Sequence, residues 1–167
     1  MDFNRFTEKL QEGFRSAQAL ASKRGHQQID VEHLLLSLLE QEGGLMQSLL
    51  AKAEVDLTLV HKKLSEELDR APQVSGSAPG VDQYYVTKRL QDLLGRAEKE
   101  ASHLKDDYVS VEHVVLAANT EKVFRDMGIT YQRILRTLQT IRGGQRVTTQ
   151  NPEATYESLE KYGSDLT

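Results

Sequence analysis

Few side chains in this sequence have the type and spacing that chemistry requires, and two histidines are the first candidates. His33 and His113 each follow a glutamate, Glu32 and Glu112, in matching Val-Glu-His segments. Histidine and glutamate are common zinc ligands. Neighbouring residues on a helix point about 100° apart, however, so a Glu-His pair does not place both groups on one face. We expect a packing or first-turn role for both histidines and no metal site.

The other polar candidates also have local explanations. Glu32 and Glu112 fall in the first turn of expected helices, where the helix dipole favours a carboxylate. Thr7 and Thr87 are suited to hydrogen bonds with nearby backbone groups. The two glutamates are therefore expected to stabilise helix starts, and the two threonines to form local backbone hydrogen bonds.

Motifs that would indicate an enzyme are missing. The sequence has no Gly-x-x-x-x-Gly-Lys-Ser/Thr phosphate loop, no Gly-x-Gly-x-x-Gly, no Gly-x-Ser-x-Gly and no His-Glu-x-x-His. Asp106 and Asp107 precede a helix by several residues and are interpreted as solvated loop acids. We expect no catalytic residue and no cofactor in this chain.

An internal repeat positions these residues. Asp30–Leu36 (DVEHLLL) returns as Ser110–Leu116 (SVEHVVL), at an offset of 80. Later in the copies the offset falls to 74, because the loop Glu40–Ser48 corresponds to the shorter loop Thr120–Lys122. Each copy has the apolar spacing of four helices. In the first copy we expect helices at about Asn4–Arg24, from Val31 onward, at Leu45–Ala53 and from Asp56 to Arg70. In the second copy we expect them at about Thr87–Leu104, from Val111 onward, at Glu121–Met127 and at Thr130–Arg142.

The ends of these helices carry recognisable signals. Asp30 and Ser110 are expected N-caps, and Gly25 and Gly143 are expected stops. The fold class is therefore all-α, with two pseudo-symmetric four-helix repeats packed as one domain over residues 1–144. Repeat one covers about 1–70 and repeat two about 82–144, joined by a loop at 71–81. Residues 145–167, polar and Thr-rich at first, are expected to form an extended linker.

Composition excludes several classes of protein. The 167 residues carry a net charge of −4 and contain no cysteine. A disulfide framework and a zinc ribbon are thus excluded, and no basic stripe favours nucleic acid. No run approaches the roughly 18 apolar residues of a membrane span, and the first residues do not form a signal peptide. We expect a cytoplasmic protein without nucleic-acid or membrane partners.

The segment after the second repeat resembles a known family. Residues 142–153 (RGGQRVTTQNPE) and 156–163 (YESLEKYG) are similar to the segment that joins the N-terminal domain of ClpB-type disaggregases to their first AAA+ ring. Residues 6–10 (FTEKL), 31–35 (VEHLL) and 41–44 (QEGG) also resemble this family, and the resemblance covers the whole chain. Ser164 departs from it, because the family usually has arginine there.

The resemblance implies a stress-response chaperone module that binds exposed apolar segments of unfolded or aggregated polypeptides. Family positions implicated in substrate binding match Thr7, Asp106 and Glu112, with Leu94 and His113 in the groove wall. At position 113 the family can have leucine. ATP and magnesium would belong to the missing rings, and the full-length protein would be a homohexamer that cooperates with a DnaK-type chaperone.

An alternative is an adaptor-docking domain, as in ClpA/ClpC-type unfoldases, while an independent enzyme is not supported. We expect the isolated chain to be a helical monomer that binds no ATP and binds unfolded polypeptide with micromolar or weaker affinity.

Overall fold

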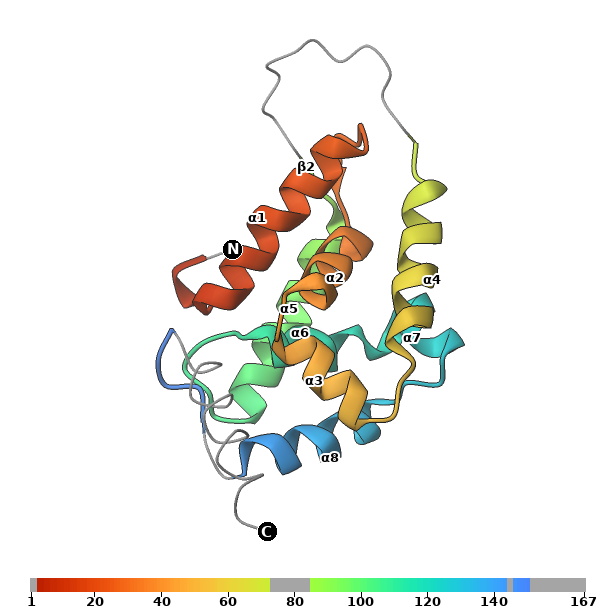
Figure 1. The fold of residues 1–167 in the computed structure, drawn as a ribbon. Coiled ribbons are helices and arrows are strands. Elements are labelled where there is room, and N and C mark those ends of the chain that lie inside the picture. Colours follow the sequence, from red (N-terminus) through yellow and green to blue (C-terminus); the bar gives the residue numbers. More distant parts are fainter. Residues whose placement is uncertain (1–2, 73–84, 144–145, 151–167) are drawn as a thin grey trace.

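The computed structural model describes residues 3–72, 85–143 and 146–150, and within these ranges it is almost entirely helical (Figure 1). The α-helices are α1 (Glu8–Lys23), α2 (Val31–Glu40), α3 (Leu45–Lys52), α4 (Leu57–Asp69), α5 (Lys88–His103), α6 (Val111–Ala117), α7 (Lys122–Asp126) and α8 (Tyr131–Arg142). Two 3-10 turns, η1 (Phe3–Arg5) and η2 (Ala118–Thr120), and two short strands, β1 (Gln28–Ile29) and β2 (Tyr85–Val86), complete the described elements. The predicted all-α class, with four α-helices in each repeat, is confirmed.

The caps that begin and end these helices follow local chemistry. The Thr7 hydroxyl accepts the Leu10 amide at 3.4 Å, and Thr87 accepts the Leu90 amide at 3.1 Å. Each threonine thereby satisfies one of the N–H groups that a helix start leaves unpaired. The local hydrogen-bonding role predicted for both threonines is confirmed. Gly25 and Gly143 take φ of 73° and 61°, a region that favours glycine.

The first helix starts four residues later than predicted. Phe6 forms a parallel bridge with Val109, in which the Val109 amide donates to Arg5 O at 2.8 Å and the Thr7 amide donates to Val109 O at 2.9 Å. Backbone groups engaged with the other repeat cannot also make helical hydrogen bonds. The predicted start at Asn4 is therefore wrong, and α1 begins at Glu8.

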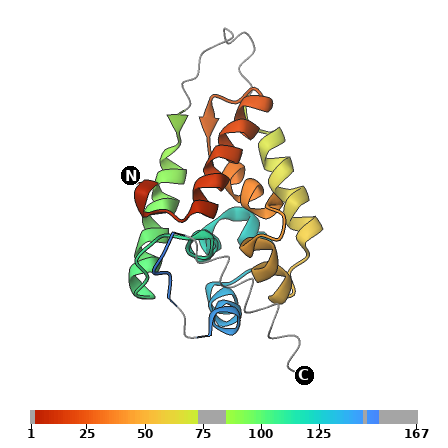
Figure 2. The ribbon, with the colours of Figure 1, turned by 60° about the vertical axis from the view of Figure 1, so that its left-hand side comes forward.

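A second parallel backbone pairing joins the two repeats at equivalent residues. The strands β1 and β2 are parallel, with Ile29 opposite Val86 (Figure 2). Adding 80 to Phe6 gives Val86, and adding 80 to Ile29 gives Val109. Each copy therefore contributes equivalent residues to two equivalent cross-repeat pairs, as expected of two copies related by a pseudo-two-fold axis. The sequence analysis did not predict these strands, because two residues are too few for a periodic signal.

One hydrophobic core joins both repeats. Most of the apolar residues matched by the repeat are buried in it, including Leu10, Phe14, Ala17 and Ala21 on α1 and Leu90, Leu94, Ala97 and Ala101 on α5, while Val55 and Met127 are partly buried. Helices α2 and α5 pack across the repeats, as do α3 and α6. The core therefore belongs to neither repeat alone.

The segments predicted as loop and linker are only partly described. The loop expected at 71–81 lies outside the described residues apart from Ala71 and Pro72, and so does most of the linker expected at 145–167. Residues 146–150 are described and lie against the domain, with Val147 fully buried. In the described part of the chain, no helix has the length and apolar character required of a membrane span.

Candidate functional site

All five residues expected at a binding site are buried. They are Thr7, Leu94, Asp106, Glu112 and His113. Asp106, Glu112 and His113 come together in one polar cluster. Thr7 is tied to the same region by the hydrogen bond that its backbone amide donates to the Val109 carbonyl. Leu94 lies in the apolar core on the buried face of α5. All five side chains therefore lie below the molecular surface.

Asp106 is the centre of the polar cluster. Its carboxylate accepts two hydrogen bonds from Arg142, at 2.6 and 3.0 Å, and a third from the Val147 amide at 2.8 Å. His113 Nε2 lies 2.7 Å from Asp106 Oδ2. The interpretation of Asp106 as a solvated loop acid is therefore wrong, because the end of α8 and the following segment cover it. Asp107 is exposed, as predicted.

The hydrogen bonds determine the charge state of Asp106. Burial acts to raise the pKa of this carboxyl, but hydrogen bonds from His113, Arg142 and the Val147 amide lower it to about 2. The carboxylate is therefore ionised and forms a buried, two-point ion pair with Arg142.

Both repeated histidines act in capping boxes. The Asp30 amide donates to His33 Nδ1 at 2.9 Å, and the Ser110 amide donates to His113 Nδ1 at 2.8 Å. Since Nδ1 is the acceptor in each ring, the neutral ring carries its hydrogen on Nε2. His113 donates this hydrogen to Asp106, whereas His33 Nε2 lies 2.8 Å from His26 Nδ1. The first-turn role predicted for both histidines is confirmed.

Glu112 is in the first turn of α6, as predicted, and is fully buried. Its Oε1 accepts the Ser110 hydroxyl at 2.6 Å and lies 3.9 Å from Arg142 Nη1. Burial raises the pKa of this carboxyl above its ordinary value, although His113 and Arg142 counteract the effect. Arg142 therefore faces both acids of the cluster.

The ligand atoms of Asp106, Glu112 and His113 lie within 4.8 Å of one another, a spacing that a metal ion could use. The guanidinium of Arg142, however, already binds both oxygens of Asp106. It supplies the positive charge that a metal would bring. The arrangement is that of a structural ion pair.

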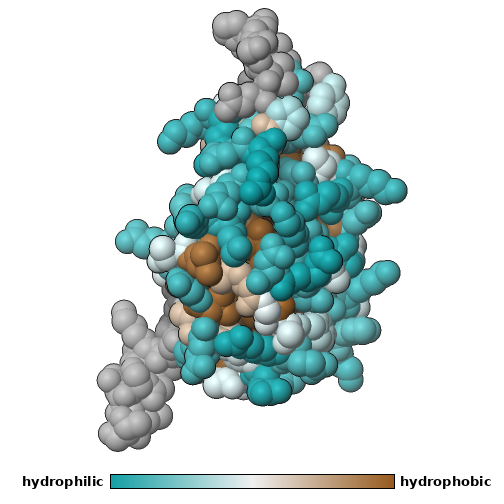
Figure 3. Space-filling model, turned by 90° about the vertical axis from the view of Figure 1, so that its right-hand side faces the viewer, coloured by the Kyte–Doolittle hydropathy of each residue, from teal (hydrophilic) through white to brown (hydrophobic). Residues whose placement is uncertain are grey.

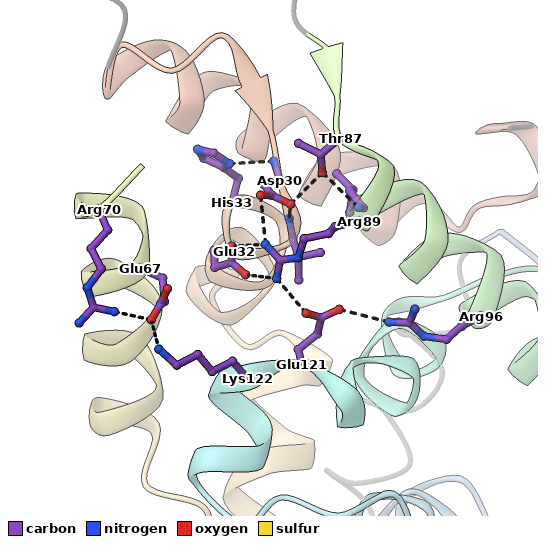
Figure 4. Close-up of polar contacts among 12 residues, drawn as sticks. Asp30, Glu32, His33, Glu67, Arg70, Thr87, Arg89, Arg96, Glu121 and Lys122 are labelled. Atoms are coloured by element: carbon purple, nitrogen blue, oxygen red, sulfur yellow. Dashed lines mark hydrogen bonds and ion pairs between the residues drawn. The ribbon is translucent and has the colours of Figure 1, made fainter. Parts of the chain in front are cut away.

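A second polar network joins the repeats near the surface (Figure 4). Arg89 on α5 binds both oxygens of Glu32, at 2.9 and 3.1 Å, and also reaches Asp30 and Glu121. Glu121 in turn accepts a hydrogen bond from Arg96. Burial raises the pKa of Glu32, and the contacts with Arg89 oppose this shift. Arg89 therefore ties the start of α2 to the start of α7.

An apolar hollow of about 400 Å³ opens beside α1. It is lined by Phe3, Phe14, Ile29 and Val86, together with Gln11, Arg15 and Gln18. Phe3 is 45% exposed, and its ring meets those of Phe6 and Phe14 edge-on, with centroids 5.3 Å away in each case. The sequence analysis missed this hollow, because the cross-repeat strand pair supplies Ile29 and Val86.

A second hollow, of about 820 Å³, lies along α5 and is richer in charge. Its lining includes Arg5, Arg96, Glu98, Lys99 and Glu100. The face of α4 and α7 is mostly hydrophilic around one apolar area (Figure 3). Leu59 on α4 is a large apolar residue that is 39% exposed.

Comparison with known proteins gives consistent matches. The Clp repeat (R) N-terminal domain family matches residues 5–126. The chaperone protein ClpB of Bacillus cereus is 49% identical over 171 residues, which cover 99% of this chain and 20% of the relative. The chain thus spans about a fifth of the length of the curated relatives that it matches.

Two solved structures show the same fold. The Hsp104 N-terminal domain from Candida albicans has a TM-score of 0.74 at 20% identity, covering 89% of this chain and 98% of that one. The complex of the ClpV N-domain with a VipB peptide has a TM-score of 0.70 at 19% identity, covering 87% and 92%.

Proposed function

We propose that this chain, which belongs to the Clp repeat (R) N-terminal domain family, captures client polypeptide for a ClpB-type chaperone. It would bind exposed apolar segments of unfolded or aggregated protein, and AAA+ rings outside this chain would then disaggregate the client with ATP. The apolar hollow beside α1, with the exposed ring of Phe3 at its edge, carries this proposal. A ClpV N-domain of the same fold has been solved with a VipB peptide.

The apolar side chains in the hollow suit weak binding that tolerates different client sequences. Burial of apolar surface contributes about 25 cal/mol per Å², before the cost of ordering is subtracted. A few client side chains can therefore reach the roughly 8 kcal/mol of a micromolar complex. Gln11, Arg15 and Gln18 would offer polar contacts to the client backbone at the rim. Weak binding also allows the client to be passed on.

The five buried residues act as positioning residues in this proposal. Thr7 caps α1 and bonds to Val109, which fixes the turn that carries Phe3. Asp106, Glu112 and His113 hold the loop before α6, to which Val109 belongs. Leu94 supports α5 from the core.

An adaptor-docking domain is the second candidate, and the charged hollow along α5 favours it. A folded adaptor would present complementary charges to Arg96, Glu98 and Lys99, and its binding would weaken with salt. Client capture through Phe3 would be much less sensitive to salt. The salt dependence of binding therefore separates the two functions.

The remaining features of the proposal concern the whole protein. We place ATP, magnesium and the hexamer contacts in the missing rings, with a DnaK-type chaperone as a cooperating partner in the cytoplasm. The fragment itself would bind no cofactor and catalyse no reaction. A nucleotide-dependent rise in its melting temperature would contradict this, because a ligand that binds the native state stabilises it.

The test of capture compares two exposed apolar residues. Phe3→Ser should lower the affinity for a reduced and alkylated, permanently unfolded protein by about two- to tenfold, because an aromatic contact is worth about 0.5–1.5 kcal/mol. Leu59→Ser is the matched control on α4 and should leave affinity unchanged. A folded protein serves as the negative client. Equal binding by wild type and Phe3→Ser would argue against the hollow, and loss only in Leu59→Ser would move the site to the α4 face.

A second comparison tests the positioning role. Thr7→Ala, Glu112→Ala and Leu94→Ser should lower affinity only to the extent that they lower the melting temperature, because their side chains are buried. Affinity and melting curves are measured on the same samples. Loss of binding in a variant of unchanged stability would instead assign that side chain a direct contact with the client.

A further inference from the structure

Residues 146–150, which come shortly after the second repeat, lie on the domain and belong to no helix or strand. Val147 is fully buried, and both of its backbone groups are bonded: its amide donates to Asp106 Oδ1 at 2.8 Å, and its carbonyl accepts the Asp107 amide at 2.8 Å. Its neighbours Arg146 and Thr148 are exposed. One apolar side chain is thus inserted while the residues on either side face solvent.

The far end of the segment is held by the start of α1. The carbonyl of Gln150 accepts the Glu8 amide at 2.8 Å, and its side-chain amide donates to Asn4 O at 2.9 Å. The Glu8 amide is one of the N–H groups that a helix start leaves unpaired. Figure 2 shows this dark blue segment running between the start of α1 and the loop before α6.

We define the linker cradle as Asn4, Glu8, Asp106, Asp107 and the apolar hole filled by Val147. It recognises backbone groups and a single apolar side chain, and these are features that any extended polypeptide can offer. Recognition of this kind resembles the addition of a strand, in which main-chain hydrogen bonds give affinity and one pocket gives a side-chain preference. An acceptor at Asp106, two backbone donors and an apolar hole are already in position.

We propose that the linker cradle is a binding site for an extended client segment with a branched apolar residue, and that the chain's own residues 146–150 occupy it until a client displaces them. The proposal rests on the proposed function, since the displacing ligand is unfolded polypeptide. Displacement of residues 146–150 by a client would free five linker residues, which span up to about 17 Å when extended. Client capture would thereby lengthen the tether between this domain and the rest of the protein.

The first experiment weakens the binding of residues 146–150 to the linker cradle in the full chain. Val147→Ser removes the buried apolar group, and it should strengthen binding of the reduced and alkylated client by about three- to tenfold, because a larger fraction of chains has an empty cradle. Val60→Ser is the matched control, since Val60 is a fully buried valine on α4. It should lower stability without strengthening binding. Affinity is measured by fluorescence anisotropy at a temperature at which circular dichroism shows both variants folded.

The second experiment fixes residues 146–150 in the linker cradle with a cross-link. The chain has no native cysteine, so Asn4→Cys and Gln150→Cys can be joined selectively by a short bismaleimide. The cross-linked chain should bind the client at least about threefold more weakly than the same variant capped with N-ethylmaleimide.

The outcomes separate this inference from the proposed function. Equal client affinity in wild type, Val147→Ser and the cross-linked chain would overturn the linker cradle as a client site and leave client capture standing. Absence of client binding in all of these chains would overturn both. Stronger binding by Val147→Ser with weaker binding by the cross-linked chain would support the exchange.

Discussion

His113 Nε2 lies 2.7 Å from Asp106 Oδ2, and the equivalent position in the first repeat is taken by a second histidine, His26, which lies 2.8 Å from His33. The backbone arrangement is the same in both copies, because the N-cap amide binds Nδ1 of the first-turn histidine in each. The charge differs. In the second copy the ionised carboxylate of Asp106 is paired with Arg142, whereas in the first copy burial lowers the pKa of both His26 and His33.

The ion pair of Asp106 predicts a large effect on stability. Asp106→Asn should lower the free energy of unfolding by about 3 kcal/mol, because it leaves the buried guanidinium of Arg142 without its counter-charge. The folded pKa of Asp106, about 2, lies below the unfolded value of 3.8. Its contribution is therefore present above about pH 4 and is lost as the pH falls toward 2. Urea denaturation measures both effects, and exposed Asp107→Asn is the control. An equal loss in both variants would contradict the assignment.

The histidine pair of the first repeat predicts a pH dependence at milder acidity. Burial and the proximity of His26 lower the pKa of His33 from 6.5 to about 4. The unfolded chain therefore binds the proton first, and stability falls as the pH drops from about 6.5 to about 4, by on the order of 3 kcal/mol. Glutamine can keep the capping box without titrating.

His33→Gln should therefore flatten the stability profile in this window, as measured by thermal melts from pH 4 to 7. The exposed His103→Gln is its control and should keep the wild-type slope. An unchanged slope in His33→Gln would rule out His33 as the titrating group.

The surface network of Arg89 predicts a smaller effect. Arg89→Met keeps the aliphatic stem but removes the contacts with Glu32 and Glu121, and it should cost about 1 kcal/mol. The loss should shrink in high salt, since Arg89 is half-exposed. Lys88→Met, at an exposed neighbouring position, should have little effect. A loss independent of salt would indicate packing rather than charge.

Replacement of two glycines in helix interiors by alanine should have opposite effects on stability. A Cβ at Gly13 would overlap the buried side chain of Leu38, because α1 and α2 approach closely there. A Cβ at Gly95 on α5 meets nothing within 4 Å. Gly95→Ala should therefore stabilise the protein by up to about 1 kcal/mol through helix propensity, whereas Gly13→Ala should destabilise it. Chemical denaturation gives the free energy of unfolding of both variants. Stabilisation by Gly13→Ala would show that Leu38 can move away at little cost.

The features of this fold that depend on neighbouring residues could be predicted from the sequence. Apolar spacing and caps such as Asp30 and Ser110 predicted the helices, since these signals act within a turn or two. The 80-residue offset predicted two similar four-helix units. The main error in a helix bound, at Asn4, arose because Phe6 is paired with Val109, a residue about 100 positions away.

Local spacing and self-similarity along the chain were enough to predict the all-helical class, the repeat and the first-turn positions of His33 and His113. Asp106, by contrast, is a buried ion-pair partner rather than a solvated acid because of tertiary contacts. Arg142 and Val147 lie 36 and 41 residues further along the chain, and no local pattern indicates that they return to it. Burial and charge pairing are properties of the folded arrangement, so the linker cradle could be recognised only after the chain was folded.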